Sequence, residues 1–356
     1  MKHDQKALVI ISPGFPKDEA DTTCLPAQQI FIKALNKKFP SLNVIILSCR
    51  YPFSRSSYKW YGNIVIPFNV KKKSLIGWVR LWRVLDELKK ENDIIGLFSF
   101  WCGECAFIGK YFGKRNSLKH FTWILGQDAR KGNKYIPLIR PQSNELIAMS
   151  YFLSKEFYKN YGIQPQHIIP NGIDTSLFLP RNVERDITIL GAGSLIALKQ
   201  YDVFINVVKE IIKKMPDTSA MLCGKGSRQM ELHQLILQQQ LQNNIVLTGE
   251  KPHREILALM QHAKIFLHTS NYEGFSTVCL EALCAGCHVI SFIKPMQHDI
   301  DHWHIVETKE EMINKALNLL NDAATQYSCV FPYSMDANAR SVMDLFGYNP
   351  TNEVVG

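Results

Sequence analysis

Two glutamates in the C-terminal half of this 356-residue chain have the type and spacing for ligand chemistry. Glu273 lies in a polar turn after an apolar run of strand length, and Glu281 comes eight residues later. The segment around Glu281 is apolar on every side, which predicts a buried helix, and no Lys or Arg lies three or four residues away. Since an unpaired buried carboxylate is costly, we expect the hydroxyl groups of a ligand to satisfy it.

The turn between the two glutamates predicts an anion site. Gly274, Phe275, Ser276 and Thr277 lead into the predicted helix, and backbone N–H groups at the start of a helix attract anions. Ligands of open parallel sheets bind at the carboxyl ends of the strands, where Glu273 stands. Carboxylates for sugar hydroxyl groups beside a place for phosphate indicate a nucleotide sugar as the ligand.

This stretch resembles the signature of the family-four (group 1) retaining glycosyltransferases, which have the GT-B fold. The resemblance rests on residues 273–276, on the E-x7-E spacing to Glu281 and on Ala285-Gly286, and residues 170–174 resemble the PNGID segment of that family. It implies a metal-independent, configuration-retaining sugar transfer from a UDP-, GDP- or ADP-linked donor. In that scheme Glu273 accepts hydrogen bonds from the sugar and Glu281 from the ribose.

The resemblance extends to a Gly-rich turn in which Lys199 would bind the diphosphate. The family presents both an Arg and a Lys here, but Ser194 stands in the Arg position, so one cation is missing. Either Ser194 with Lys225 or Arg228 of the next Gly-rich turn compensates, or diphosphate binding is weaker. The predicted donor site comprises Ser194, Lys199, Gly224, Lys225, Glu273, Gly274, Phe275, Ser276, Thr277 and Glu281.

Asp128 joins Glu273 and Lys199 as the third candidate for catalysis. It ends a Gly-Gln-Asp segment after the predicted strand 121–125, and many family members have a similar Gly-x-Asp at this place. The resemblance implies a role on the acceptor or sugar side. The alternative is an aspartate that caps a loop, and the sequence leaves both open.

The elements that must position these residues predict an α/β fold of the GT-B type. From residue 186 onward, strand and helix patterns alternate strictly, which indicates a parallel sheet. We predict two Rossmann-like parallel-sheet domains that face a cleft: an acceptor-side domain over 1–164 and a nucleotide-sugar-binding domain over 186–334. Residues 165–185, rich in Pro, Gly and Asn, indicate a linker. By resemblance, a helix in 335–356 crosses back onto the first domain.

Charge is distributed unevenly along the chain. Residues 1–170 hold 26 Lys and Arg against 12 Asp and Glu, a net charge of +14, whereas residues 171–356 hold 15 against 20. A basic half indicates an anionic partner, so we predict an anionic or lipid-linked glycan acceptor of cell-surface polysaccharide or lipopolysaccharide synthesis, and an anionic membrane surface. The alternative is a basic face that serves solubility alone. We do not expect nucleic acid.

The segment 75–90 is an amphipathic helix with Trp78 and Trp82 on its apolar face. Such a helix can lie on a membrane, but core packing is favoured. No apolar run reaches the ~20 residues of a membrane span, and nine scattered cysteines indicate a reducing compartment. We therefore expect a cytoplasmic protein that can also bind the inner face of the membrane as a peripheral protein.

Three other interpretations have less support in the sequence. We therefore expect neither a cofactor nor a metal. Cys102 and Cys105 resemble the thioredoxin dithiol, but Glu104 replaces the usual proline. Gly191-Ala192-Gly193 resembles an NAD(P) fingerprint, but the acid that should end the next strand is missing. Residues 298–304 carry Asp and His side chains that could bind a metal. A non-catalytic sugar-nucleotide-binding protein remains a further alternative.

Overall fold

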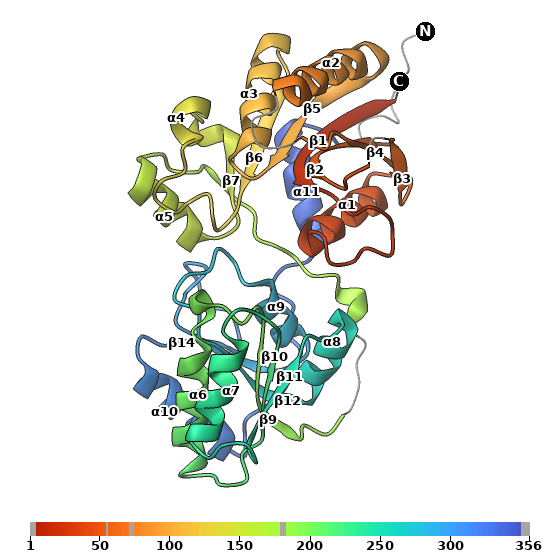
Figure 1. Ribbon diagram of the computed structural model, residues 1–356. Coiled ribbons are helices and arrows are strands. Elements are labelled where there is room, and N and C mark those ends of the chain that lie inside the picture. Colours follow the sequence, from red (N-terminus) through yellow and green to blue (C-terminus); the bar gives the residue numbers. More distant parts are fainter. Residues whose placement is uncertain (1–4, 55, 71–74, 179–182, 350–356) are drawn as a thin grey trace. The chain divides into compact units, whose positions relative to one another are not determined.

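The computed structural model describes residues 5–54, 56–70, 75–178 and 183–349. The chain divides into two compact units, residues 1–172 with 333–356, and residues 173–332. In each unit, helices cover a mainly parallel sheet (Figure 1). The segment predicted as a linker, 165–185, is divided between the units, because it contributes the strand β8 to the first sheet.

The first unit contains an eight-stranded sheet with the order β3-β4-β2-β1-β5-β6-β7-β8. All neighbouring strands are parallel except β3 and β4. The central strand β1 is fully buried from Ala7 to Ile11, as expected for a parallel strand covered on both faces. The strands are β1 (Lys6–Gly14), β2 (Asn43–Tyr51), β3 (Tyr58–Trp60), β4 (Asn63–Pro67), β5 (Asp93–Phe100), β6 (Lys119–Ile124), β7 (Leu146–Ala148) and β8 (His167–Ile168).

The α-helices among the described residues of this unit are α1 (Pro26–Lys38), α2 (Leu75–Glu91), α3 (Glu104–Asn116), α4 (Ile136–Ile139), α5 (Tyr151–Tyr161) and α11 (Met335–Phe346). The last of them, α11, packs on α1. Lys37 and Lys38 of α1 pair with Asp336 at 2.8 and 3.1 Å, and Phe346 stacks edge-on against Phe121 of β6. The predicted return of the C-terminal helix to the first domain is confirmed.

The helix α2 contributes its apolar face to the core of the first unit. Leu81 and Leu85 are fully buried, and Trp78 and Trp82 pack against the same cluster. The core interpretation of the tryptophan stripe is therefore confirmed. The opposite face of α2 is open, with Ile76 84% exposed.

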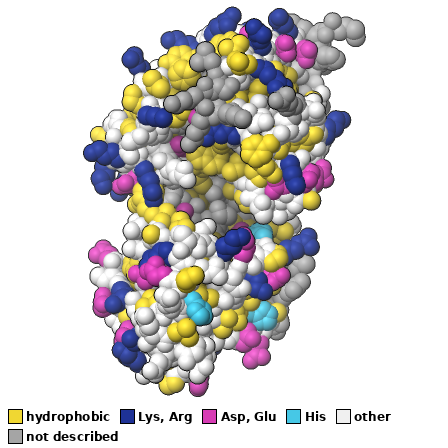
Figure 2. Space-filling model, viewed as in Figure 1, with side chains coloured by type: hydrophobic (Ala, Val, Ile, Leu, Met, Phe, Trp, Pro, Cys, Tyr) yellow, Lys and Arg dark blue, Asp and Glu magenta, His cyan; other side chains and the backbone are white. Residues whose placement is uncertain are grey.

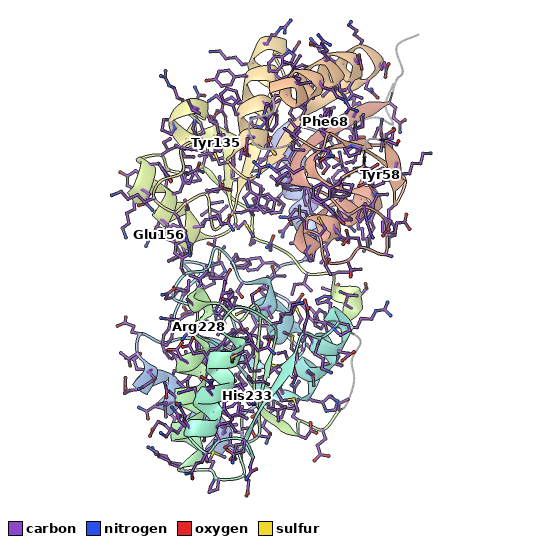
Figure 3. The ribbon with its side chains drawn as sticks, viewed as in Figure 1. Tyr58, Phe68, Tyr135, Glu156, Arg228 and His233 are labelled. Carbon is purple, nitrogen blue, oxygen red and sulfur yellow. The ribbon has the colours of Figure 1, made fainter. Side chains whose placement is uncertain are left out.

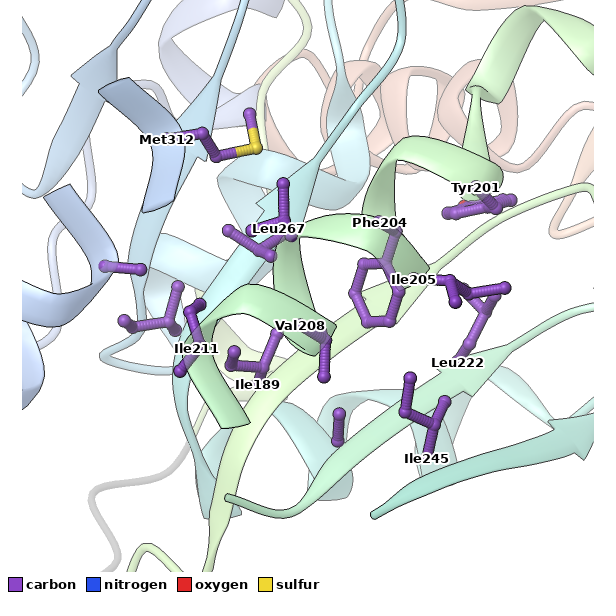
Figure 4. Close-up of a cluster of buried hydrophobic side chains, with 14 of the residues drawn as sticks. Ile189, Tyr201, Phe204, Ile205, Val208, Ile211, Leu222, Ile245, Leu267 and Met312 are labelled. Carbon is purple, nitrogen blue, oxygen red and sulfur yellow. The ribbon is translucent and has the colours of Figure 1, made fainter. Parts of the chain in front are cut away.

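The second unit contains a parallel six-stranded sheet with the order β11-β10-β9-β12-β13-β14. Its core is formed by apolar side chains of the central strands and of α6, among them Ile189, Phe204 and Val208 (Figure 4). The elements are β9 (Ile187–Ala192), α6 (Tyr201–Ile212), β10 (Ala220–Cys223), α7 (Gln229–Gln238), β11 (Ile245–Gly249), α8 (His253–His262), β12 (Ala263–His268), α9 (Thr277–Cys284), β13 (His288–Ser291), β14 (Trp303–Ile305) and α10 (Lys309–Asn321).

Candidate functional site

Lys199 and Glu273 form an ion pair at the point where the winding of the second sheet reverses. The chain passes from β9 to β10 on one side of β9, and β12 lies on its other side. Lys199 lies in the turn after β9 and Glu273 in the loop after β12. The Lys199 Nζ atom is 2.5 Å from Glu273 Oε2, and the two side chains are 18% and 24% exposed. Such reversal points are where open α/β sheets bind ligands.

His268, the last residue of β12, lies beside Glu273. Its side chain is 5% exposed, and its Nε2 atom lies 3.6 Å from Glu273 Oε2. The same nitrogen is 3.3 Å from the hydroxyl groups of Ser270 and Ser276. At 3.6 Å the contact with the carboxylate is a close polar contact rather than a hydrogen bond.

The ionisation of Glu273 follows from these neighbours. Burial alone would raise the pKa of its carboxyl group, but His268 and the positive charge of Lys199 outweigh burial and lower the pKa to about 2. Burial in turn lowers the pKa of His268. Glu273 is therefore a carboxylate at neutral pH and offers acceptor oxygens to hydroxyl groups.

A small pocket lies beside Glu273. Its polar lining consists of His268, Glu273 and Ser276, and its apolar lining includes Phe275, Pro295 and Trp303. Phe275 is 4% exposed, and its ring centroid lies 6.2 Å from that of Trp303. A few polar groups against apolar and aromatic side chains are typical of small-molecule sites.

The loops after β9 and β10 approach each other so closely that glycine is required. Gly193 N–H donates to Cys223 O at 3.0 Å. A Cβ atom on Gly224 would lie 1.9 Å from Gly193 O, and Gly224 has a φ of +143°. Gly224 thus shapes this part of the site by letting the two backbones meet. Ser194, in the same region, is exposed.

Glu281 already has a partner within the protein, contrary to the expectation that a ligand would satisfy its carboxylate. Its Oε1 atom lies 2.8 Å from Nε2 of His253, at the start of α8, and its side chain is 12% exposed. The hydrogen bond that His253 donates to the Glu281 carboxylate raises the pKa of His253. No sequence pattern indicated this pair, because 28 residues separate its members. His268 was also missed, although a histidine that ends an apolar strand is a usable signal.

The two cations expected to replace the missing arginine are both paired. Arg228, labelled in Figure 3, binds Asp202 at 2.8 Å and also Glu231. Lys225 pairs with Glu250 at 2.8 Å, and both side chains are more than two-thirds exposed. Lys225 can therefore turn to a ligand at little cost, whereas Arg228 is held in place by two carboxylates.

Asp128, in the first unit, is buried beneath its own loop. The side chain is 5% exposed and accepts the N–H of Leu125 at 2.8 Å. Burial raises the pKa of the carboxyl group to about 7, although backbone hydrogen bonds from Leu125 and Cys102 oppose this. This is the geometry of a carboxyl group that holds a loop.

Cys102 and Cys105 are both free and buried, which does not suit a reactive thioredoxin pair. Cys105 Sγ lies 3.8 Å from Sγ of Cys49 on β2, and Cys102 is fully buried. Burial raises the pKa of the Cys102 thiol, which makes the thiolate unfavourable.

The acidic and histidine side chains near 298–304 have different partners, since His302 and His304 both stack on His288. Asp299 pairs with Lys294 at 2.5 Å, whereas His304 Nε2 lies 3.0 Å from His288 Nδ1. Among the residues that the structure describes, no group of three or more His, Cys, Asp and Glu side chains is arranged to hold a metal ion.

Residues 175–327 match the family of glycosyl transferases group 1. These residues form a group 1 glycosyltransferase domain. The matched range contains Lys199, Glu273 and Glu281. The predicted GT-B fold is confirmed by solved structures: HepE from Anabaena, in complex with UDP, has a TM-score of 0.67 and 16% identity over 95% of this chain and 94% of that protein.

Two curated relatives each match part of this chain. One is a phosphatidylinositol N-acetylglucosaminyltransferase component from Homo sapiens, 27% identical over 163 residues, which is 45% of this chain and 34% of that protein. The 2-deoxystreptamine N-acetyl-D-glucosaminyltransferase of Niallia circulans is 32% identical over 104 residues, 29% of this chain and 27% of that protein. The match thus spans about a third or less of the length of these relatives.

Proposed function

We propose that this protein is a retaining glycosyltransferase that moves a sugar from a nucleotide sugar to a lipid-linked or other anionic glycan acceptor. The observation that carries the proposal is the Lys199–Glu273 pair at the reversal point of the second sheet, inside the group 1 domain. A cation for phosphate and a carboxylate for hydroxyl groups, side by side, fit the two halves of a nucleotide sugar.

The chemistry assigned to this pair is charge stabilisation and positioning. A bound diphosphate would pair with the ammonium group of Lys199, and the hydroxyl groups of the sugar would donate hydrogen bonds to Glu273. Lys199 and Glu273 would thus each exchange their present partner for a part of the nucleotide sugar. As the bond between sugar and phosphate breaks, negative charge grows on the diphosphate, and a fixed cation lowers that barrier. The amides of 274–277 at the start of α9 would contribute in the same direction.

The nucleotide is assigned to Glu281 and its neighbours. His253 holds the Glu281 carboxylate in one orientation, and the remaining oxygen would accept the ribose hydroxyl groups. Relatives that carry N-acetylglucosaminyltransferase in their names and a neighbour in complex with UDP favour UDP-N-acetylglucosamine as the first donor to test.

The acceptor is proposed to bind the first unit, which carries a strong excess of basic residues. Figure 2 shows many Lys and Arg side chains over the visible face of this unit. Arg80 and Arg83 are exposed on α2 beside Ile76, which suits an anionic surface with some apolar character. The basic run Lys71–Lys73 lies outside the described residues. Among the described residues, no helix has both the length and the apolar character needed to cross a membrane.

Calorimetric titration with UDP, GDP and ADP tests the donor site. We expect UDP to bind most tightly, and Glu281→Ala to weaken it by about 1–3 kcal/mol for lost charged hydrogen bonds. Glu310→Ala, which removes a carboxylate that is 72% exposed on α10, is the matched control and should bind UDP as wild type does. Equal affinity of Glu281→Ala and wild type would refute the assignment. Slow hydrolysis of the donor without acceptor would distinguish an enzyme from a binding protein.

A further inference from the structure

Two buried thiols of the first unit are in contact with each other. Cys49 belongs to β2, Cys105 is the second residue of α3, and their Sγ atoms are 3.8 Å apart. The two residues are only 1% and 3% exposed. The thiol contact of Cys105 is therefore with a strand 56 positions away in the chain, and the local Cys102–Cys105 spacing in the sequence gave no sign of it.

The same two segments are also joined by a salt bridge. Arg50 follows Cys49, Glu104 precedes Cys105, and the side chains of Arg50 and Glu104 form an ion pair. These side chains are 38% and 28% exposed, so the ion pair is open to solvent and the thiols are not. Tyr135, labelled in Figure 3, donates its hydroxyl group to Glu104. The end of β2 and the start of α3 thus meet through an exposed polar contact beside a buried thiol contact.

The environment of Cys105 makes its thiol slow to react but leaves room for a small molecule to approach. The hydrogen bond with Cys49 and burial raise the pKa of Cys105 well above its ordinary value, and the charge of Glu104 acts in the same direction. The thiolate, which is the nucleophile, is therefore rare. At Gly103, no heavy atom lies within 4 Å of the position that a Cβ would take, so there is open space directly before Glu104.

We infer that Cys49 and Cys105 form an oxidative modification site, at which hydrogen peroxide converts the two thiols into a disulfide that ties β2 to α3. The Cys105 thiolate attacks one oxygen of the peroxide, the O–O bond breaks, and the hydroxide that leaves takes up the thiol proton as water. The Cys49 thiol then attacks the sulfur of the resulting sulfenic acid, the S–O bond breaks, and a second water leaves. Two electrons and two protons thus pass from the thiols to the peroxide.

The separation of the two sulfur atoms suits this reaction. A disulfide bond is about 2.05 Å long, so the sulfurs, now 3.8 Å apart, must approach each other by about 1.8 Å. Because the bond would join residues 56 positions apart, it would restrict the unfolded chain and stabilise the first unit. The site does not depend on the proposed function, since Lys199 and Glu273 belong to the second unit.

The test is peptide mapping of the full chain after treatment with hydrogen peroxide. Trypsin leaves Cys49 in residues 39–50 and both Cys102 and Cys105 in residues 91–110, so a disulfide between these two peptides shows the link directly. We expect this product in wild type and in Cys102→Ala, and we expect none in Cys49→Ala. The linked wild type should melt at least about 5 °C above the reduced protein.

The ion pair beside the thiols sets the expected rate of the reaction. Glu104→Gln removes the partner of Arg50 and also a charge that raises the pKa of Cys105, so it should speed the formation of the link by about two- to fivefold. Glu87→Gln removes an exposed carboxylate from α2. It is the matched control and should react at the wild-type rate.

The exposed thiol of Cys329 reports in every sample whether the peroxide has acted. Absence of the linked peptides from wild type in which Cys329 is already oxidised would overturn the inference, and Cys49 and Cys105 would then be core residues only. A disulfide between Cys102 and Cys105 in place of the link would overturn it as well. Equal rates in Glu104→Gln and wild type would contradict the role given to the ion pair.

Discussion

Glu273 shows how one residue can be partly buried and still carry charge. It is surrounded by apolar side chains on one side, yet Lys199 at 2.5 Å and His268 at 3.6 Å keep its carboxyl group ionised. A carboxylate that already accepts from a cation is kept charged and close to the place where the donor would bind, so it can exchange this partner for hydroxyl donors without changing its protonation state.

Glu273→Gln should therefore reduce turnover much more than nucleotide affinity. The amide keeps the shape of the side chain but loses the charge that orders Lys199 and the hydroxyl groups, a loss of about 1.5–3 kcal/mol in the transition state. Steady-state rates with UDP-N-acetylglucosamine, set beside UDP titrations, measure the two effects separately. Parallel losses of turnover and UDP affinity would contradict the assignment to the sugar.

Asp128→Asn should become relatively more stable as the pH rises. The carboxyl group has an ordinary value of 3.8 and a folded value of about 7, so the folded state binds the proton more tightly than the unfolded state. The wild type thus loses stability between about pH 4 and pH 7, and the neutral asparagine does not. Melting temperatures at pH 4.5 and pH 8 check this. A difference between variant and wild type that does not change with pH would contradict it.

The same variant separates the two roles of Asp128. If the carboxyl group holds its loop, Asp128→Asn should keep transfer activity within a few-fold at pH 8. If it takes part in catalysis, activity should fall about a hundredfold or more while the protein remains folded.

At the residue scale, the sequence predicted the candidate residues better than their partners. Lys199 and Glu273 could be proposed for one ligand because each follows a strand of the same predicted sheet. The Glu281–His253 pair and the Arg50–Glu104 pair could not be predicted, because they depend on which strand ends are neighbours. Periodicity gives the elements but not their order in the sheet.

At the scale of elements, the site depends on how the loops after β9 and β10 meet. Gly224 N–H donates to Gly249 O at 2.8 Å, while its Cα faces Gly193 O with no room for a methyl group. The loop after β9 also carries Lys199, so the position of the cation depends on this contact between backbones.

Gly224→Ala should destabilise the second unit and weaken UDP binding. The added methyl group must push the two loops apart, which costs about 1–3 kcal/mol beyond the conformational strain. Gly249→Ala is the matched control: its φ is +72°, but no heavy atom lies within 4 Å of the new Cβ, so it suffers strain of about 1–2 kcal/mol without the clash. Urea unfolding and UDP titration of both variants measure the difference. Equal losses in the two variants would show that the close approach is unimportant.

The strands that sequence patterns did not predict are short. β3, β8 and β14 span three, two and three residues, which is too short for an apolar period to be visible. Longer runs such as Ala7–Ser12 and Ile94–Phe100 lie within the observed strands β1 and β5. The alternation of strands and helices was enough for the fold class, since it requires parallel crossovers.

At the scale of the whole molecule, the uneven charge sets the expected partner. Residues 1–170 carry a net charge of +14, whereas acidic residues are in excess in the remainder. This distribution attracts anions to one part of the chain only. Each Lys or Arg close to an anionic membrane contributes about 1 kcal/mol, so a cluster of a few is enough for reversible binding.

Binding to anionic vesicles should therefore decrease with salt and with loss of Lys71, Lys72 and Lys73. Co-sedimentation with anionic and neutral vesicles, at low and high salt, measures it. Changing the three lysines to Gln should release most of the protein at a salt concentration that wild type tolerates, because surface charges are screened within about 10 Å at 0.1 M.

The matched control changes Lys209, Lys213 and Lys214 to Gln, which removes the same charge from the second unit. That variant should sediment with anionic vesicles as wild type does, because the charges it lacks belong to the unit with the acidic excess. Equal losses in the two triple variants would mean that net charge alone governs the attraction. Equal, salt-independent recovery on anionic and neutral vesicles would exclude membrane binding through charge and favour a soluble acidic acceptor.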